Sequence, residues 1–249
     1  MITDGEVDTY ERDGVVLIRG VLDCAWVERM QAAVDRVIAA PTDHGGTHGA
    51  FSHDLFLWRH DDDFRALAID SPLPAIAARL MRTTSLRLFF DQLLVKEPGL
   101  RASIAWHQDL MTFPLTGEQV VSLWVPFDRA TPDNGVVSYA KGSHRWGTLF
   151  TDRNYADSVG EAEVPDPSTF ETLQWDVEPG DVVAHHPLTL HGSRGNRSEV
   201  RRRALSVRYA GDDIRFLARQ PNFMSRSGLP LPDLADGAPL DHELFPVLR

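Results

Sequence analysis

Cysteine is almost absent from this sequence, since Cys24 is the single one among 249 residues. A lone cysteine cannot form an internal disulfide, so we expect a reducing, cytoplasmic location. Long apolar runs are missing too, because no stretch approaches the ~20 apolar residues that a membrane-spanning helix needs. The acidic first residues, MITDGEVDTYERDG, lack the apolar segment of a secretory signal peptide. These absences predict a protein that does not enter a membrane.

Basic charge is also scarce, with 25 Lys and Arg against 36 Asp and Glu and a formal net charge of -11. A surface of this charge repels nucleic acid and anionic membranes, and no basic stripe in the sequence offsets it. We therefore expect a small-molecule ligand, no nucleic acid and no membrane, for a chain that acts as a monomer or homodimer.

The composition that remains, 43% apolar and 24% charged, is that of a globular protein with room for a substantial core. The pattern predicts a strand in residues 14–23, then a helix in 24–40 with Asp23 as its N-cap. A second helix is expected in residues 71–82. The segment 47–64 mixes polar and aromatic residues and is expected to be a loop.

From residue 85 onward the sequence consists of short β-branched or aromatic segments separated by turn signals such as EPG and PDNG. Many short strands between turns predict a sandwich or a barrel. No repeat, low-complexity tract or linker divides the chain. We therefore expect one domain over residues 1–249, with the N-terminal helices covering one face of a β-sandwich.

The motif AWHQDL contains His107 and Asp109, whose side chains would share one face of a strand and could bind one metal ion. An isolated motif of this kind is common by chance, so a third ligand is required. The segment VVAHHPLTLH, read as one strand, offers His185, His186 and His191. We expect His191, at its far end, to complete the site. We interpret the other two histidines as polar groups, hydrogen-bonded at the sheet surface or at the rim of the site.

Two imidazoles and one carboxylate leave positions open on an ion, which is typical of non-haem Fe(II) oxygen chemistry. Arg202 lies eleven residues beyond His191. If the two strands run antiparallel, its guanidinium could bind a carboxylate through two parallel hydrogen bonds. Ser193 could donate a hydroxyl to the same group. Arg201 and Arg203 are interpreted as solvated basic residues.

The segments WHQD, DNG, KGSH, HHPLTLHGS, NRS and RRALSVRY together resemble the phytanoyl-CoA dioxygenase family of Fe(II)- and 2-oxoglutarate-dependent oxygenases. The resemblance runs from ERDGVVLIRGVLD to about residue 210. It implies a mainly β fold with flanking α-helices, built on a double-stranded β-helix (jelly-roll, cupin-like) core. The helices would pack on the larger of its two sheets. The resemblance also implies that Fe(II), 2-oxoglutarate and O2 take part in the reaction.

Carried over residue by residue, the resemblance makes His107, Asp109 and His191 the iron ligands. It makes Arg202 the partner of the distal carboxylate of 2-oxoglutarate, with Ser193 as the hydroxyl that binds the same group.

Further residues of the cosubstrate pocket follow from the same resemblance. Trp124 would form an aromatic wall beside the cosubstrate, although an ordinary core tryptophan explains it equally well. Gln92 is the better inward candidate on its strand, whereas Lys96 could be a solvated strand end. Gln108, between the two ligands, should face away from them.

Asp109 also bears on the reaction, because halogenating relatives need Gly or Ala here to leave room for chloride. We therefore expect hydroxylation or a related oxidation. Met111, Phe113 and the aromatic segment around residues 51–58 would face a small, mostly apolar metabolite, with the acidic segment 150–166 as a lid. A secondary-metabolite tailoring reaction fits this best. A CoA thioester does not fit, because no basic cluster is evident for its phosphates.

Two other classes remain open at this point. One is a non-oxidative, cupin-like metalloenzyme of the zinc hydrolase type, which would have no use for Arg202. The other is a catalytically silent protein that binds a metal or a ligand.

Overall fold

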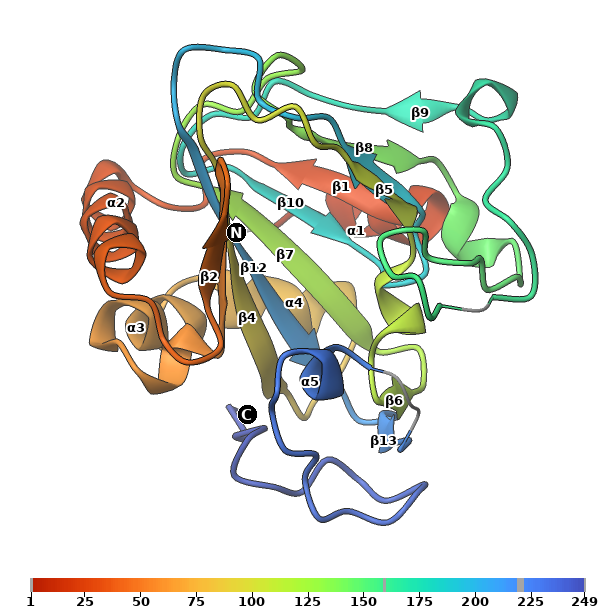
Figure 1. Cartoon of the computed structure of the whole chain (residues 1–249). Helices are drawn as coiled ribbons and strands as arrows, with labels where there is room; N and C mark the ends of the chain where they lie inside the picture. Colours follow the sequence, from red (N-terminus) through yellow and green to blue (C-terminus); the bar gives the residue numbers. More distant parts are fainter. Residues whose placement is uncertain (1, 159, 219–221, 249) are drawn as a thin grey trace.

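The chain folds into two facing β-sheets with helices on the outside of the larger one (Figure 1). The computed structural model describes residues 2–158, 160–218 and 222–248. Within them the larger sheet has, in spatial order, β1 (Val15–Ile18), β10 (Val182–His185), β7 (Val120–Pro126), β12 (Arg202–Ala210), β4 (Arg87–Lys96), β3 (Phe51–Leu55) and β2 (Gly46–His48).

The smaller sheet and a short two-stranded ribbon complete the β-structure of the described residues. The smaller sheet has the order β5 (Ile104–His107), β11 (His191–Ser193), β8 (Val137–Ala140) and β9 (Thr172–Leu173), and the ribbon pairs β13 (Arg215–Phe216) with β6 (Leu115–Thr116). All these pairings are antiparallel. The architecture is the jelly roll that the sequence resemblance implies.

The helices lie mostly at the N-terminal end of the chain. They are α1 (Asp4–Asp13), α2 (Cys24–Ala39), α3 (Asp62–Asp70), α4 (Leu73–Leu80) and α5 (Phe223–Arg226), with 3-10 turns η1 (Leu57–Arg59), η2 (Asp109–Met111), η3 (Ser143–Arg145) and η4 (Pro167–Thr169). Helices α3 and α4 contact β4 and β7 of the larger sheet, as the resemblance implies (Figure 1). Across the described residues, none of the helices has the length and apolarity to span a membrane.

Local sequence signals explain the ends of two helices. Helix α2 begins after Asp23, whose side chain accepts a hydrogen bond from the N–H of Trp26, and this confirms the predicted N-cap. Helix α1 was not predicted, although Thr3 and Glu6 form a capping box at its start. Gly14 ends α1 in the left-handed region at φ 74°.

The expectation of a loop over residues 47–64 is wrong. Strands β2 and β3 form a hairpin there, and β3 pairs with the long strand β4, with His53 opposite Leu94. The stabilising hydrogen bonds come from a partner about 40 residues away in the sequence, so the local mixture of polar and aromatic residues did not predict them.

The segment VVAHHPLTLH does not form the single strand that we expected. Its first part is β10 in the larger sheet, and His191 begins β11 in the smaller sheet. The chain therefore crosses from one sheet to the other at residues 186–190. Strand β12 pairs with β4 and β7, not with β11. Arg202 consequently faces His191 from the opposite sheet instead of returning along a neighbouring strand.

The long strand β4 separates the protein core from a cavity between the two sheets. Phe90, Gln92 and Leu94 line the cavity, whereas Phe89 and Leu93 belong to the buried apolar core. This alternation follows from the period of two along a strand. The position of the site is therefore set by which residues of β4 and β12 face inward.

Candidate active site

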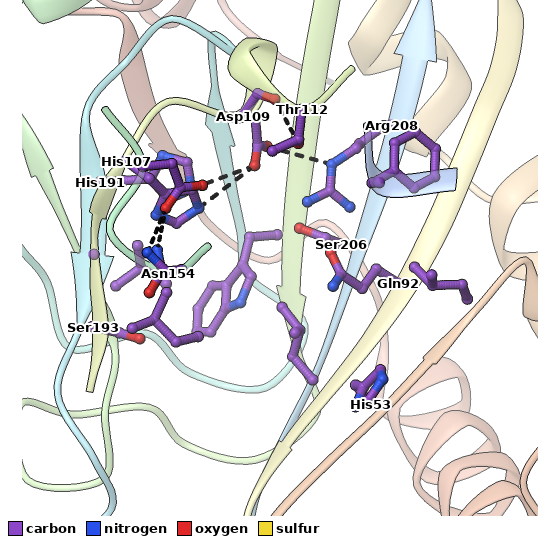
Figure 2. Close-up of a pocket in the computed structure, with 18 of the residues that line it drawn as sticks. His53, Gln92, His107, Asp109, Thr112, Asn154, His191, Ser193, Ser206 and Arg208 are labelled. Atoms are coloured by element: carbon purple, nitrogen blue, oxygen red, sulfur yellow. Dashed lines mark hydrogen bonds and ion pairs between the residues drawn. The ribbon is translucent and has the colours of Figure 1, made fainter. Parts of the chain in front are cut away.

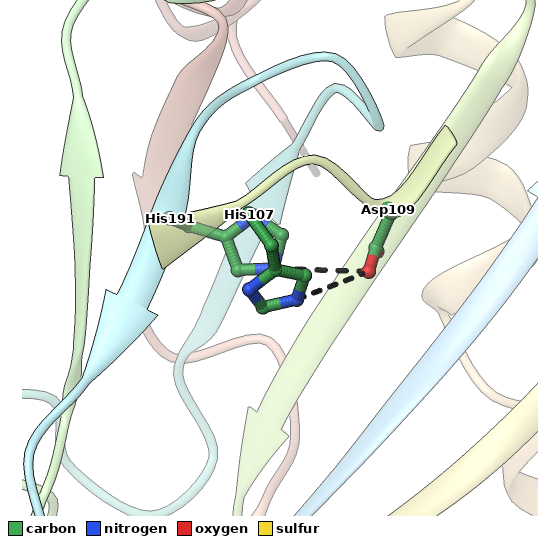
Figure 3. Close-up of side chains that lie close together, drawn as sticks. All are labelled: His107, Asp109 and His191. Atoms are coloured by element: carbon green, nitrogen blue, oxygen red, sulfur yellow. Dashed lines mark ion pairs between the residues drawn. The ribbon is translucent and has the colours of Figure 1, made fainter. Parts of the chain in front are cut away.

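His107, Asp109 and His191 lie together at one end of the cavity (Figure 3). His107 ends β5 and is the register partner of His191 in β11, so the two imidazole centroids are 4.2 Å apart. The Nε2 atoms of both histidines are 3.8 Å from Asp109 Oδ1. Asp109 lies in the 3-10 turn η2, beyond the strand. The predicted convergence thus arises from a turn in the chain, and not from strand alternation.

Both imidazoles are oriented by the protein backbone. The Nδ1 atom of His107 donates to the carbonyl of Ala105, and that of His191 donates to the carbonyl of Thr189, both at 2.9 Å. A neutral imidazole that donates from Nδ1 carries a lone pair on Nε2. Burial lowers the pKa of His191 well below its ordinary range. Two lone pairs and one carboxylate oxygen therefore face the same point, as metal coordination requires.

The second carboxylate oxygen of Asp109 is held by three neighbours. Ser122 Oγ donates to Oδ2 at 3.0 Å, Arg208 Nε lies 3.4 Å from it, and His185 Nε2 lies 3.5 Å from it. Burial alone would raise the pKa of Asp109, but Arg208, His185 and His191 together hold it well below its ordinary range. The carboxylate is therefore ionised and oriented, with Oδ1 facing the two histidines.

His185 is a site residue that the sequence interpretation missed. Its exposed fraction is only 3%, and it lines the cavity 3.5 Å from Asp109 instead of lying at the sheet surface or at the rim of the site. A usable signal existed, because His185 shares a strand face with Val183, which packs beside Trp124 inside the sandwich. His186 is half-buried and hydrogen-bonded to the carbonyl of Glu118 at 3.2 Å, as we interpreted it.

A cavity of about 610 Å³ extends from the three residues between the two sheets (Figure 2). Arg202 lines it from β12 and is only 2% exposed. Its Nη1 donates to the carbonyl of Leu94 at 3.1 Å, and Trp124 lies beside it with the ring centroid 5.6 Å from Cζ. Burial lowers the pKa of Arg202 to about 10. No carboxylate pairs with this guanidinium among the described residues, so the arrangement fits an anionic ligand.

Lys96 is also buried, and its interpretation as a solvated strand end is wrong. Its exposed fraction is 0%, and Nζ donates to Ser193 Oγ at 2.7 Å and to the carbonyl of Arg194 at 2.5 Å. Burial, with a smaller effect from Arg202, lowers its pKa to about 6. The same period of two that directs Gln92 into the cavity also directs Lys96 inward, so the sequence did contain the signal.

The structure separates the remaining candidates into cavity and core. Gln108 is buried away from the cavity and hydrogen-bonds to the carbonyl of Leu188, as expected. Phe113 lines the cavity, whereas Phe56 and Trp58 belong to the apolar core. Met111 is not among the lining residues. From the acidic segment 150–166, three residues line the cavity, namely Asp152, Asn154 and Tyr155.

A jelly roll with this donor set and a buried arginine across the cavity is typical of the non-haem iron, 2-oxoglutarate-dependent oxygenases. Residues 10–204 match the sequence model of the family Phytanoyl-CoA dioxygenase (PhyH), and the chain belongs to this family. His107, Asp109 and His191 form the candidate metal site of the chain. The reaction and the substrate are a separate question, because relatives of this fold differ in both.

Among its relatives is the probable alpha-ketoglutarate-dependent hypophosphite dioxygenase of Stutzerimonas stutzeri, 33% identical over 137 residues. That match covers 52% of this chain and 46% of the relative, so it spans less than half of the relative's length. The solved carbocyclase SnoK from nogalamycin biosynthesis is 27% identical with a TM-score of 0.81, covering 99% of this chain and 96% of its own. The epimerase SnoN, solved with Fe3+, alpha-ketoglutarate and nogalamycin RO, has the same TM-score at 24% identity, covering 99% and 98%. The likeness to SnoN concerns the fold alone.

Proposed function

We propose that this protein is an Fe(II)- and 2-oxoglutarate-dependent oxygenase that hydroxylates, or oxidises in a related way, a small organic metabolite. In this proposal His107, Asp109 and His191 bind the iron through Nε2, Oδ1 and Nε2. The observation that carries it is the meeting of these three atoms in a cavity also lined by Arg202, a buried arginine for which the described residues offer no carboxylate partner. A closed structural metal site would have no use for Arg202.

The residues of this chain fit the cosubstrate as well as the metal. Arg202 is proposed to bind the distal carboxylate, with Ser193 donating its hydroxyl and Trp124 and Gln92 lining the same part of the cavity. When bound, iron and 2-oxoglutarate supply the oxidant, derived from O2, that removes hydrogen from the substrate. The protein orients these groups and keeps water away from them. Asp109 occupies the position that a halide would need, so we propose hydroxylase-type chemistry and not halogenation.

The size and lining of the cavity support a metabolite larger than hypophosphite. Its volume of about 610 Å³ is within the range of sites for drug-sized ligands. The part beside Asp109 is lined by Phe90, Phe113 and Phe223, which favour an apolar ring. The likeness to SnoK, a carbocyclase from nogalamycin biosynthesis, supports a role in secondary metabolism.

The proposal is tested by anaerobic titration with Fe(II) followed by 2-oxoglutarate. A keto acid that chelates the iron produces a visible charge-transfer band, which a zinc hydrolase does not show. Release of succinate is the test against a catalytically silent binding protein. His191→Ala and His107→Ala should each abolish the band, because each removes one of three ligands.

His186→Ala is the matched control, since His186 neighbours the site but does not line the cavity. It should retain the band. A band of full intensity in His191→Ala would contradict the ligand assignment, and its absence in the wild-type protein would contradict the oxygenase proposal. Release of succinate in the presence of candidate metabolites would then identify the substrate.

A further inference from the structure

Three phenylalanines form an apolar surface in the part of the cavity next to Asp109. Phe90 and Phe223 are stacked with ring centroids 4.1 Å apart, and Phe113 meets Phe90 edge to face at 5.5 Å. All three line the cavity. Phe113 and Phe223 are brought together by a backbone hydrogen bond from Phe223 N to the carbonyl of Thr112. A flat, ring-bearing molecule is the natural ligand for such a surface.

Arg208 extends over this surface and has a buried N–H donor that pairs with no described residue. Its Cζ atom lies 4.5 Å from the centroid of Phe90, and its side chain is only 6% exposed. The single close partner of the guanidinium in the described structure is Asp109 Oδ2, at 3.4 Å from Nε. Nη1 is buried and has no hydrogen-bond partner among the described residues. Figure 2 shows the guanidinium directed into the cavity.

A second guanidinium, Arg226, reaches the cavity from α5, three residues beyond Phe223. Its Nη2 donates to Asp157 at 2.8 Å, and its Cζ lies 3.9 Å from the ring centroid of Tyr155. Nε and Nη1 are buried without a partner among the described residues. Holding the 150–166 segment in place requires only the bond to Asp157, so two donor atoms remain unexplained.

Buried N–H groups are costly unless an acceptor pairs with them. From these contacts we infer that Arg226 and Arg208 bind an anionic oxygen group of the substrate, which is a ring-bearing monoanion such as an aromatic carboxylate or phenolate. This inference rests on the proposed function, because it describes the substrate of that same site.

The acidic neighbours limit the charge that the site can accept. Asp109 is close to Arg208, and Asp157 is paired with Arg226. Asp152 also lines the cavity, and its Oδ2 is buried without a partner in the described part of the chain. Two guanidiniums thus face three carboxylates, so it is the unpaired N–H donors, and not an excess of positive charge, that would bind an anion. Such a site suits one negative charge and disfavours the several charges of a CoA thioester or a polyphosphate.

The inference is tested with three probes on protein loaded anaerobically with Fe(II) and 2-oxoglutarate, using titration calorimetry. The probes are 2-naphthoate, its neutral counterpart 2-naphthalenemethanol, and acetate, which has the charge without the ring. We expect 2-naphthoate to bind at least tenfold more tightly than either of the others. Equal affinity for the two naphthalenes would overturn the anionic part of the inference. If acetate bound as tightly as 2-naphthoate, the inference that the substrate carries a ring would be wrong.

Arg226→Gln should reduce the preference for naphthoate over naphthalenemethanol to about twofold or less. Arg153→Gln is the matched control, because Arg153 lies in the 150–166 segment that Arg226 contacts through Asp157, pairs with Glu163, and has a side chain that is 67% exposed. It removes the same charge and should leave the preference unchanged. A preference that survives in Arg226→Gln would contradict the role of this residue. If that variant fails to fold, the wild-type ratio alone still decides the inference.

The two proposals can fail separately. A normal charge-transfer band with equal affinities for the naphthalenes would refute the substrate inference and leave the oxygenase proposal intact. If the charge-transfer band were missing but the preference for naphthoate still depended on Arg226, the oxygenase proposal would be refuted. The proposed anion-binding site would then be retained.

Discussion

Lys96 and Arg202 place two basic side chains in the interior, where Arg202 lines the cavity and Lys96 is bonded to Ser193, which also lines it. They are register partners on β4 and β12, and their exposed fractions are 0% and 2%. An uncompensated buried charge is unfavourable, so a lysine in this position loses its proton more easily than one in water. Its lowered pKa of about 6 means that the Lys96 amine is neutral near pH 7.5 in the ligand-free protein. A neutral amine still has two N–H groups for its bonds to Ser193 and Arg194.

This property predicts proton uptake when 2-oxoglutarate binds. A carboxylate bound nearby favours the charged amine and should raise the pKa of Lys96 again. Near pH 7.5 we expect an uptake that approaches one proton per cosubstrate, and an affinity that decreases as the pH rises above 6. Calorimetry in two buffers of different ionisation enthalpy measures this. Lys96→Met should abolish the uptake, and an uptake of zero in the wild-type protein would show that Lys96 is already charged.

At the scale of residues, the sequence predicted the groups that form a motif but not those that become buried through strand pairing. His107, Asp109, His191 and Arg202 carry their signal in type and spacing. His185 and Lys96 carry a signal only in the period of two along β10 and β4, and that period predicts burial only when the inward face of each strand is known. Arg226 had no local signal at all, since α5 reaches the cavity through tertiary contacts.

The strand β4 presents a different chemistry on its other face. Asp91 is 0% exposed there, and Oδ2 accepts a hydrogen bond from the N–H of Trp58 at 3.0 Å. Its Oδ1 has no partner among the described residues. Burial raises the pKa of Asp91 to about 7. Below that pH the group is a neutral acid inside the protein, and above it the fold must hold a buried charge.

This predicts that stability decreases as the pH rises towards 7. An acid whose folded pKa exceeds its unfolded pKa binds more protons in the native state between the two values, roughly pH 4 to 7. Within this window the free energy of unfolding should fall by about 1.4 kcal/mol per pH unit from this group. Asp91→Asn keeps an acceptor for Trp58 and should remove that slope, making the variant more stable than the wild type at pH 8.

Denaturant unfolding at pH 5 and pH 8 gives the required comparison. Asp62→Asn, an exposed acid at the start of α3, serves as the control and should follow the wild-type slope. If Asp91→Asn shows the same pH dependence as this control, Asp91 is not the group responsible.

Elements with strong local signals were predicted well, and elements that depend on distant partners were not. Helix α2 followed from its apolar period and the Asp23 cap, and α4 lies within the predicted segment 71–82. The β2–β3 hairpin requires the edge of β4, and the division of VVAHHPLTLH between β10 and β11 requires the second sheet. A single segment contains no information about either partner, which is why both were misassigned.

At the scale of the whole molecule, two sheets bring residues from distant segments to one cavity. Strands β3, β4, β7, β10 and β12 contribute from the larger sheet, and β5, β8 and β11 contribute from the smaller. The sandwich itself could be predicted from the many short strands, and its jelly-roll topology from the resemblance. Of the buried charges, Asp109 and Arg202 were predicted from the motifs, whereas Arg208 and Lys96 were not. Together these charges couple ligand binding to the stability of the fold. Asp109, Arg202, Arg208 and Lys96 are all at most 5% exposed.

This coupling predicts that Fe(II) and 2-oxoglutarate together stabilise the protein. Ligands that bind only the native state add about 2.7 kcal/mol at a hundredfold excess over Kd. For a chain of this length that corresponds to an increase in Tm of about 5–11 °C. Differential scanning calorimetry under anaerobic conditions should show the increase in the wild type and in His186→Ala, and a chelator should reverse it. His191→Ala should show little or none, because its metal site is incomplete. An undiminished increase in His191→Ala would mean that the stabilising ion binds elsewhere, and the cavity between the two sheets would then not be the metal site.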